Sequence, residues 1–431
     1  MPKLPLEGIR IIDMTVVWAG PFATSLLAQL GAEVIRVESI QIMPPLTRGL
    51  MAHPTKDFVK NLPPFSGGYP DREPGQRPWN RYPIFNSHAS NKLSMTVDLT
   101  VPRGQQIFRQ LVSLSDVFID NNVVETMRKL NISYEALKAV KEDIIMVRMP
   151  AYGDHGQYSS YRALGVHMAN ALGHGLMRGY SDMDPSANSV EYTVDAASGT
   201  HSAAAILMAL LHRKRKGRGQ FIELPSAQAF TSYMAFPMLQ QSFNGIIPST
   251  LGNRDPFAIQ GCFPCQGDDR WLVITIADEV QWKSFCRLLG DPDWTKFEQF
   301  KDHLSRYQNQ DELDQHIALW TRRYDHKEAM QLLQHAGIPA GAVLDSRDAF
   351  TDPHLATRDF YQEAYSPDTG TYRYARAPFV FSKTPTKITR GPVMLGQDNE
   401  YVYKIVMGIT DSEYAELEKE GHIGTEYLDK S

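Results

Sequence analysis

The sequence has few cysteines and no apolar run long enough to cross a membrane. Its 431 residues include 3 Cys, at positions 262, 265 and 286, which is too few for a secreted disulfide framework and is typical of a reducing cytoplasm. The longest apolar run covers residues 203–211, whereas a bilayer needs ~20 residues. The first residues lack the apolar core of a secretory signal. We therefore predict a cytoplasmic protein without a membrane-spanning helix.

Signatures of several other protein classes are also missing. The formal net charge of -5 leaves no basic excess to pair with nucleic-acid phosphates, which argues against a general nucleic-acid binder. No Gly-rich loop ends in Gly-Lys-Ser/Thr and no His-Glu-x-x-His occurs, which argues against P-loop and zincin chemistry. Cys262 and Cys265 have metal-type spacing, but the sequence offers no second pair. We predict no bound metal.

The sequence does contain the pattern of a large α/β protein. With 42% apolar and 22% charged residues, the chain has an ordinary globular composition, and it is long enough for two domains. Residues 9–14, 22–30 and 34–37 predict a strand, a helix and a strand, the order that begins a parallel sheet. Further strands are predicted at 116–119 and 144–147, with helices at 105–114 and 134–140. Together these elements predict a doubly wound sheet.

Two regions depart from this pattern. Residues 40–85 are rich in Pro and Gly, with Tyr69, Trp79 and Tyr82 scattered among them. A connection of that length is usually functional, interfacial or disordered. After residue 225 the expected elements change, with a strand at 271–276 and helices at 280–289 and 311–335. This change predicts a smaller second domain.

One carboxylate stands at the beginning of an apolar helix. Asp195 precedes the Ala/Leu-rich segment 203–211, so the free N–H groups and positive end of that helix favour its ionised form. An ionised, fixed carboxylate is a candidate nucleophile. The alternative is that Asp195 is only a cap or loop residue before the helix.

Several motifs, in this order and spacing, carry a resemblance to a known family. They lie at residues 6–15, 19–21, 26–38, 91–94, 97–99, 116–121, 191–213, 217–220, 252–254, 337–343, 352–354 and 395–396. Over almost its whole length the chain resembles the class III CoA-transferase family. That family includes formyl-CoA and carnitine CoA-transferases and the alpha-methylacyl-CoA racemases.

The resemblance implies an architecture and a set of partners. It implies a Rossmann-like large domain with a smaller α+β domain, in two chains interlocked as a dimer. The large domain would comprise residues 1–225 and the returning segment 336–431, and the small domain residues 226–335. The substrates would be an acyl-CoA thioester and a carboxylic acid, with no permanently bound cofactor. The dimer partner would be a second copy or a paralogue.

The resemblance also implies roles for particular residues. Asp195 would attack the thioester and become an aspartyl-CoA thioester, and N–H groups near Gly20 and Gly252 would stabilise the oxyanions. The positions that match family CoA contacts are Trp18, Ala19, Val97, Asp98, Leu99, Thr100, Asn121, Lys129 and Arg162. Lys129 and Arg162 suit CoA phosphates, and the alternative is that they are ordinary exposed bases.

Some positions depart from the family pattern. A catalytic Gln of formyl-CoA transferases is replaced by Trp18, the Arg that commonly follows the second strand is Ser39, and an Asn-Phe-Arg segment reads Asn-Asn-Val at 121–123. Acids other than formate and oxalate are therefore expected. Trp18 and the aromatic residues of 40–85 would suit a bulky or aromatic acyl group, and the alternative is that these aromatic residues only pack in the fold. The racemases use a second acid/base where this chain has Leu164 and Gly165, unless a shifted register brings in His167. A racemase and a catalytically silent subunit remain the two alternatives.

Overall fold

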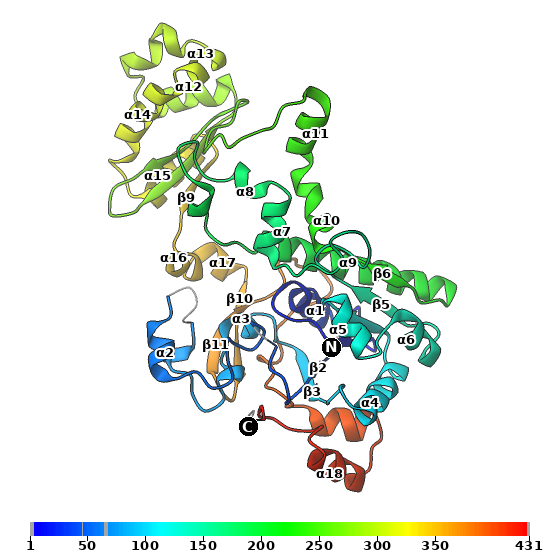
Figure 1. Cartoon of the computed structure of the whole chain (residues 1–431). Coiled ribbons are helices and arrows are strands. Elements are labelled where there is room, and N and C mark those ends of the chain that lie inside the picture. Colours follow the sequence, from blue (N-terminus) through cyan, green and yellow to red (C-terminus); the bar gives the residue numbers. More distant parts are fainter. Residues whose placement is uncertain (1–3, 45, 64–67, 429–431) are drawn as a thin grey trace. The chain divides into compact units, whose positions relative to one another are not determined.

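The structure, a computed structural model, describes residues 4–44, 46–63 and 68–428 and divides into two compact units (Figure 1). The first unit comprises Met1–Gly173, Val190–Leu239 and Ala356–Ser431, and the second comprises His174–Ser189 and Gln240–Leu355. These limits differ from the domain limits of 225 and 336 that the sequence predicts. Residues after 336 stay in the second unit because β9 (Ala340–Val343) pairs with β8 (Trp271–Ile276).

The first unit is built on a six-stranded parallel sheet with the strand order β3-β2-β1-β4-β5-β6. Its strands are β1 (Arg10–Asp13), β2 (Glu33–Glu38), β3 (Lys92–Thr96), β4 (Val117–Asp120), β5 (Ile145–Arg148) and β6 (Phe221–Glu223). The doubly wound sheet predicted from the sequence is confirmed. Because the strand order reverses between β1 and β4, the loops that follow these two strands diverge and leave a crevice at their carboxyl ends.

Helices cover both faces of this sheet, and neighbouring strand residues point to opposite faces. Ile11 packs with helices α1 (Ala19–Gln29) and α9 (Thr193–Lys216). Ile12 packs on the other face with α4 (Pro102–Ser113) and α6 (Tyr134–Val140). The first unit also contains α5 (Val124–Lys129), α7 (Gly165–Ala171), α10 (Ser226–Thr231), α18 (Asp411–Lys419) and the hairpin of β10 (Tyr361–Ser366) and β11 (Gly370–Ala375).

Helix α9 is the core helix that carries Asp195. Among the described residues it alone is long and apolar enough to span a membrane, but half of its most apolar stretch is buried in the protein, where it packs on α1, α10 and β5. A Cβ on Gly199 would lie 2.6 Å from the Ala19 carbonyl oxygen, so α1 and α9 approach closely only because this residue is Gly. The helix ends at Gly217, whose φ of 68° suits a left-handed cap.

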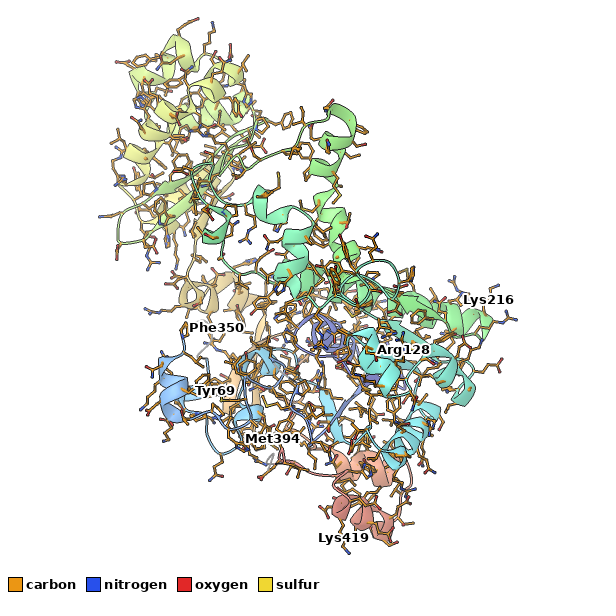
Figure 2. All side chains as sticks on the ribbon, viewed as in Figure 1. Tyr69, Arg128, Lys216, Phe350, Met394 and Lys419 are labelled. Atoms are coloured by element: carbon orange, nitrogen blue, oxygen red, sulfur yellow. The ribbon has the colours of Figure 1, made fainter. Side chains whose placement is uncertain are left out.

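The segment between β2 and β3 is folded onto the first unit. It contains α2 (Lys56–Asn61) and α3 (Pro83–Asn86). Trp79 is 2% exposed and packs with Leu395 and Tyr427, and Tyr69, labelled in Figure 2, packs with Tyr82. The aromatic residues of 40–85 are therefore largely core residues. Other residues of the segment line the site described below.

The second unit is a small α+β domain with the antiparallel sheet β7-β8-β9. Its elements include β7 (Ile259–Pro264), α8 (His174–Met177), α12 (Glu279–Leu288), α13 (His303–Gln308), α14 (Gln310–Thr321), α15 (His326–His335) and α16 (Ser346–Phe350). Helices α11 (Ala235–Asn244) and α17 (Pro353–Thr357) cross the two unit boundaries. The prediction of one helix over 311–335 is wrong, because the Asp325 side chain accepts a hydrogen bond from the Lys327 N–H and starts a new helix there.

Candidate active site

The larger of two adjoining cavities lies at the point where the strand order reverses. It has a volume of about 560 Å³ and is lined by residues that follow β1, β4 and β5, together with Arg162, Gly165 and Asp195. Open α/β sheets bind ligands in this crevice at the carboxyl ends of the strands. The topology of the sheet therefore accounts for the position of the cavity.

The loop after β1 is held in a strained conformation beside this cavity. Val17 has a φ of 62°, which is unfavourable for a β-branched residue. The Asn121 side chain accepts a hydrogen bond from Val16 N–H at 2.7 Å and donates one to Val16 C=O at 2.9 Å. Thr47 Oγ1 accepts a third from Val17 N–H at 3.0 Å. These three bonds offset the strain and fix the wall of the cavity.

Asp195 lies in the first turn of α9 and lines both cavities. Burial raises the pKa of its carboxyl to about 6, the Glu191 carboxylate adds to the rise, and the residue's own N–H opposes it. The expectation that the helix N-terminus favours the ionised form is therefore outweighed by burial. Among the described residues no other group donates a hydrogen bond to this carboxylate, and a pKa of about 6 still leaves it ionised near pH 7.

Gly165, at the start of α7, gives the carboxylate its space. A Cβ at this position would overlap Oδ2 of Asp195. Because Oδ2 is the free end of a flexible side chain, the overlap would push the carboxylate aside and leave the backbone in place. The lack of a side chain at residue 165 therefore determines where the carboxylate lies.

The smaller cavity, of about 200 Å³, opens on the other side of Asp195 and has a mainly apolar wall. The wall is formed by Val17, Leu46, Leu50, Tyr82, Pro83, Ile84, Leu164, Gly165, Val166, Val190, Glu191 and Tyr192. The rings of Tyr192 and Trp18 stack with centroids 5.5 Å apart and 13° between their planes. Trp18 also contacts His88 edge-on at 4.5 Å. Trp18 therefore supports the wall through Tyr192 and is not among the residues that line either cavity.

The structure brings together some of the predicted CoA contacts. Ala19, Asn121 and Arg162 line the larger cavity with Asp195. Lys129 is exposed at the end of α5, the helix on which Figure 2 labels Arg128. It lies one helical turn after Thr126, which also lines the larger cavity.

Other predicted contacts lie outside both cavities. Val97 and Leu99 are 1% and 7% exposed and belong to the core beneath α4. The Asp98 carboxylate accepts hydrogen bonds from Thr100. Any contact of this segment with CoA would be made at the surface, and that role stays a prediction.

His167, which a shifted register would make the second acid/base of a racemase, does not line the cavities that Asp195 lines. Its ring nitrogen Nδ1 accepts a hydrogen bond from Leu164 N–H at 3.0 Å, and the side chain is exposed outside both cavities. The residues that sequence reasoning missed are Glu191, Tyr192 and the apolar wall from 46–84. Only Glu191 carried a signal, since it stands four residues before Asp195 in the sequence.

The fold and the site define a doubly wound α/β protein in which one buried carboxylate, that of Asp195, lines two adjoining cavities. The chain belongs to the family described as CoA-transferase family III, whose family model matches residues 6–399. The resemblance inferred from the motifs is thereby confirmed. CoA-transferases act on CoA thioesters, so a CoA thioester is a substrate of this class of enzyme.

Several relatives are similar over almost the whole chain. Succinyl-CoA–D-citramalate CoA-transferase of Chloroflexus aurantiacus is 27% identical and covers 97% of this chain and 98% of its own. Formyl-CoA:oxalate CoA-transferase of Streptomyces coelicolor is 26% identical, with coverages of 98% and 100%. Succinate–glutarate CoA-transferase of Agrobacterium fabrum is 26% identical, with coverages of 93% and 95%.

Solved structures share the fold. A CAIB/BAIF family protein from Brucella suis matches with a TM-score of 0.78 at 23% identity, covering 94% of this chain and 99% of its own. Rv3272 from M. tuberculosis matches with a TM-score of 0.72 at 26% identity, with coverages of 93% and 99%.

Proposed function

We propose that this enzyme moves CoA from an acyl-CoA to a carboxylic acid through a thioester formed on Asp195. The observation that carries the proposal is the position of this carboxylate, which lies where the strand-end cavity meets the smaller apolar cavity. A nucleophile at that junction can reach a thioester carbonyl with the CoA on one side and the acyl group on the other. Apart from the backbone N–H of Asp195 itself, no described group donates to its oxygens a hydrogen bond that would lower their nucleophilicity.

The chemistry needs two exchanges at the same carboxylate. An oxygen of Asp195 attacks the thioester carbonyl, which forms a mixed anhydride and releases CoA thiolate. The thiolate attacks the aspartyl carbonyl, which forms the aspartyl-CoA thioester and releases the first acid with one oxygen from Asp195. The acceptor carboxylate then attacks the aspartyl thioester, and the released thiolate takes the acceptor acyl group. The last step regenerates the Asp195 carboxylate.

The two cavities divide the substrate between them. The larger cavity would take the thiol end of CoA, with Arg162 at its edge and Lys129 one turn beyond it for the phosphates. The N–H groups of Ala19 and Gly20 begin α1 beside this cavity. They are placed to stabilise negative charge that develops on a carbonyl oxygen during attack. The smaller cavity would take the acyl group.

The proposal is tested by trapping the intermediate. A panel of acyl-CoA donors is screened against acceptor acids by mass spectrometry, and the enzyme is then incubated with an active donor and treated with hydroxylamine. The expected product is a hydroxamate on Asp195 and on no other residue. If a productive donor leaves Asp195 unmodified, or if the adduct forms on another side chain, the proposed intermediate is wrong.

The same preparation distinguishes a transferase from a racemase. A racemase exchanges the hydrogen on the carbon beside the thioester with deuterated water when no acceptor acid is present. We expect no such exchange at a rate comparable with transfer. Exchange without transfer would favour the racemase alternative.

Neutralising the bases near the larger cavity should weaken CoA binding without changing the acid preference. We expect Arg162→Ala and Lys129→Ala each to raise the KM for every acyl-CoA, because charge-assisted hydrogen bonds to phosphate are lost. The rise should correspond to a loss of about 1–3 kcal/mol in binding free energy. The measurement is KM for two acyl-CoAs with different acyl groups.

Arg128→Ala is the matched control for these variants. Arg128 is also exposed on α5, but its guanidinium pairs with Glu125 at 2.9 Å. It should leave KM unchanged. If Arg162→Ala changes the acid preference and leaves the affinity for CoA intact, Arg162 contacts the acyl group and does not bind CoA.

A further inference from the structure

We infer that the acid handled by this enzyme is an apolar monocarboxylic acid and that dicarboxylic acids are rejected. The inference rests on the proposed function and deepens it, because it names the class of acid that enters the smaller cavity. The name of each of the three relatives described above includes an acid with two carboxyl groups (citramalate, oxalate, succinate or glutarate), and one name also includes formyl-CoA. The wall of the smaller cavity points to a different acid.

The wall offers no cation for a second carboxylate. Of the described residues that line the smaller cavity, none is Lys, Arg or His, and its two charged groups are Glu191 and Asp195. Most of the remaining wall is aliphatic, from residues such as Leu46, Leu50 and Ile84. A second carboxylate would lose its water and gain no positive partner among the described lining residues. The same wall favours an alkyl or aryl group.

Two of the basic residues that lie close in sequence to the wall are committed elsewhere. Arg48 lies between Leu46 and Leu50, but it is buried and its guanidinium binds both oxygens of Glu38, at 2.6 and 2.7 Å. It also stacks 3.7 Å from the centre of the Phe85 ring. His88 stays neutral, since burial lowers its pKa to about 3. Neither side chain is available to pair with a substrate carboxylate.

The size of the smaller cavity also fits an apolar group. Its volume is about 200 Å³, whereas an apolar protein cavity of about 150 Å³ binds benzene. A phenyl ring or a short alkyl chain can therefore enter fully. Tyr192, stacked on Trp18, presents a flat aromatic surface to such a group.

The test compares two acids that differ only at their far end. Pentanoate and glutarate have the same chain length, with a methyl group in one where the other has a carboxylate. Each is measured in an identity exchange, in which isotope-labelled acid exchanges into its own CoA thioester, so that one acid serves both half-reactions. We expect kcat/KM for pentanoate to exceed that for glutarate by about 100-fold or more, because the site leaves the second carboxylate unpaired. Equal rates, or faster glutarate exchange, would overturn the inference.

A binding measurement separates failure of this inference from failure of the proposed function. Binding of the free acids is followed by the fluorescence of the wild-type enzyme and of Trp18→Phe, which identifies the signal from Trp18. Pentanoate should bind more tightly than glutarate whether or not transfer occurs. If neither acid exchanges while pentanoate alone binds, the inference stands and the proposed function fails. If glutarate binds as tightly as pentanoate, the inference fails even when transfer is observed.

A charge introduced into the wall should reverse the preference. Leu50 is 41% exposed and lines the smaller cavity, so Leu50→Arg adds a cation there without disturbing the core. The ratio of glutarate to pentanoate exchange should rise by about 10-fold or more. Leu114→Arg is the control, since Leu114 is 40% exposed and lies outside both cavities. An unchanged ratio in Leu50→Arg would show that the acid binds elsewhere.

Discussion

Asp195→Asn should lower the rate of CoA transfer by at least about 1,000-fold, because the amide has nearly the shape of the carboxylate but cannot act as the nucleophile. The rate is measured with the donor and acceptor found in the screen. Asp57→Asn is the matched control, since Asp57 is an exposed carboxylate in the first turn of α2, and this variant should keep the wild-type rate. An Asp195→Asn enzyme that turns over at near wild-type rate would show that the nucleophile is another group.

The same substitution should make the protein more stable above about pH 6. The folded pKa of Asp195 is raised from 3.8 to about 6, so folding favours the protonated form and stability falls as the pH rises through that range. Above it the ionised carboxylate costs about 1–3 kcal/mol, and Asp195→Asn removes this cost. The free energies of unfolding should converge below about pH 4, and the transfer rate of the wild-type enzyme should fall as the pH drops through about 6.

Gly165→Ala should lower kcat by about 100-fold or more while the fold remains intact. The added Cβ overlaps Oδ2 of Asp195, and the carboxylate can rotate away without any shift of the backbone. A displacement of about 1 Å at a reacting group is enough to cost 100-fold in rate. The measurements are kcat, KM and thermal unfolding of the variant.

Gly341→Ala is the control that measures the effect of replacing a glycine by alanine where the added Cβ contacts no other atom. A Cβ on Gly341, in β9, meets no atom within 4 Å, so this variant should match the wild-type enzyme in rate and stability. If Gly165→Ala is as active as wild type, the carboxylate does not act from the position described. If Gly165→Ala unfolds, Gly165→Ser at lower temperature and a binding assay with CoA separate loss of fold from loss of the nucleophile.

Four of the six strands were predictable because each carries its own signal. Residues 10–13 and 117–120 contain the short apolar runs Ile-Ile and Val-Phe-Ile, and their burial on both faces gives the pattern of a parallel sheet. Strand β3, with the sequence Lys-Leu-Ser-Met-Thr, lacks such a run. Its lysine is buried and paired with Asp13 at 3.3 Å. That burial depends on partners distant in sequence, so local patterning does not predict it.

The sequence predicts Asp195 as the candidate nucleophile but predicts only part of the surroundings in which the structure places it. Asp195 could be named because a motif and a helix start coincide there. Its raised pKa could not, because desolvation depends on residues that pack around it from other segments. Trp18 illustrates the same limit: the sequence places it beside the site, whereas the fold turns its ring onto Tyr192. Packing between segments distant in sequence decides whether a side chain lines a cavity or packs behind the residues that line it.

The connection from β2 to β3 has a consequence for how such enzymes diversify. Asp195, the proposed nucleophile, lies on α9, and most of the larger cavity is lined by residues outside this connection, whereas the connection supplies Leu46, Leu50, Tyr82, Pro83 and Ile84 to the smaller cavity. If the smaller cavity takes the acyl group as proposed, part of the substrate choice is encoded apart from the nucleophile. A surface connection tolerates insertion and exchange at little cost in folding entropy. New acids can therefore be acquired by inheriting a different connection, while the reacting carboxylate stays where it is.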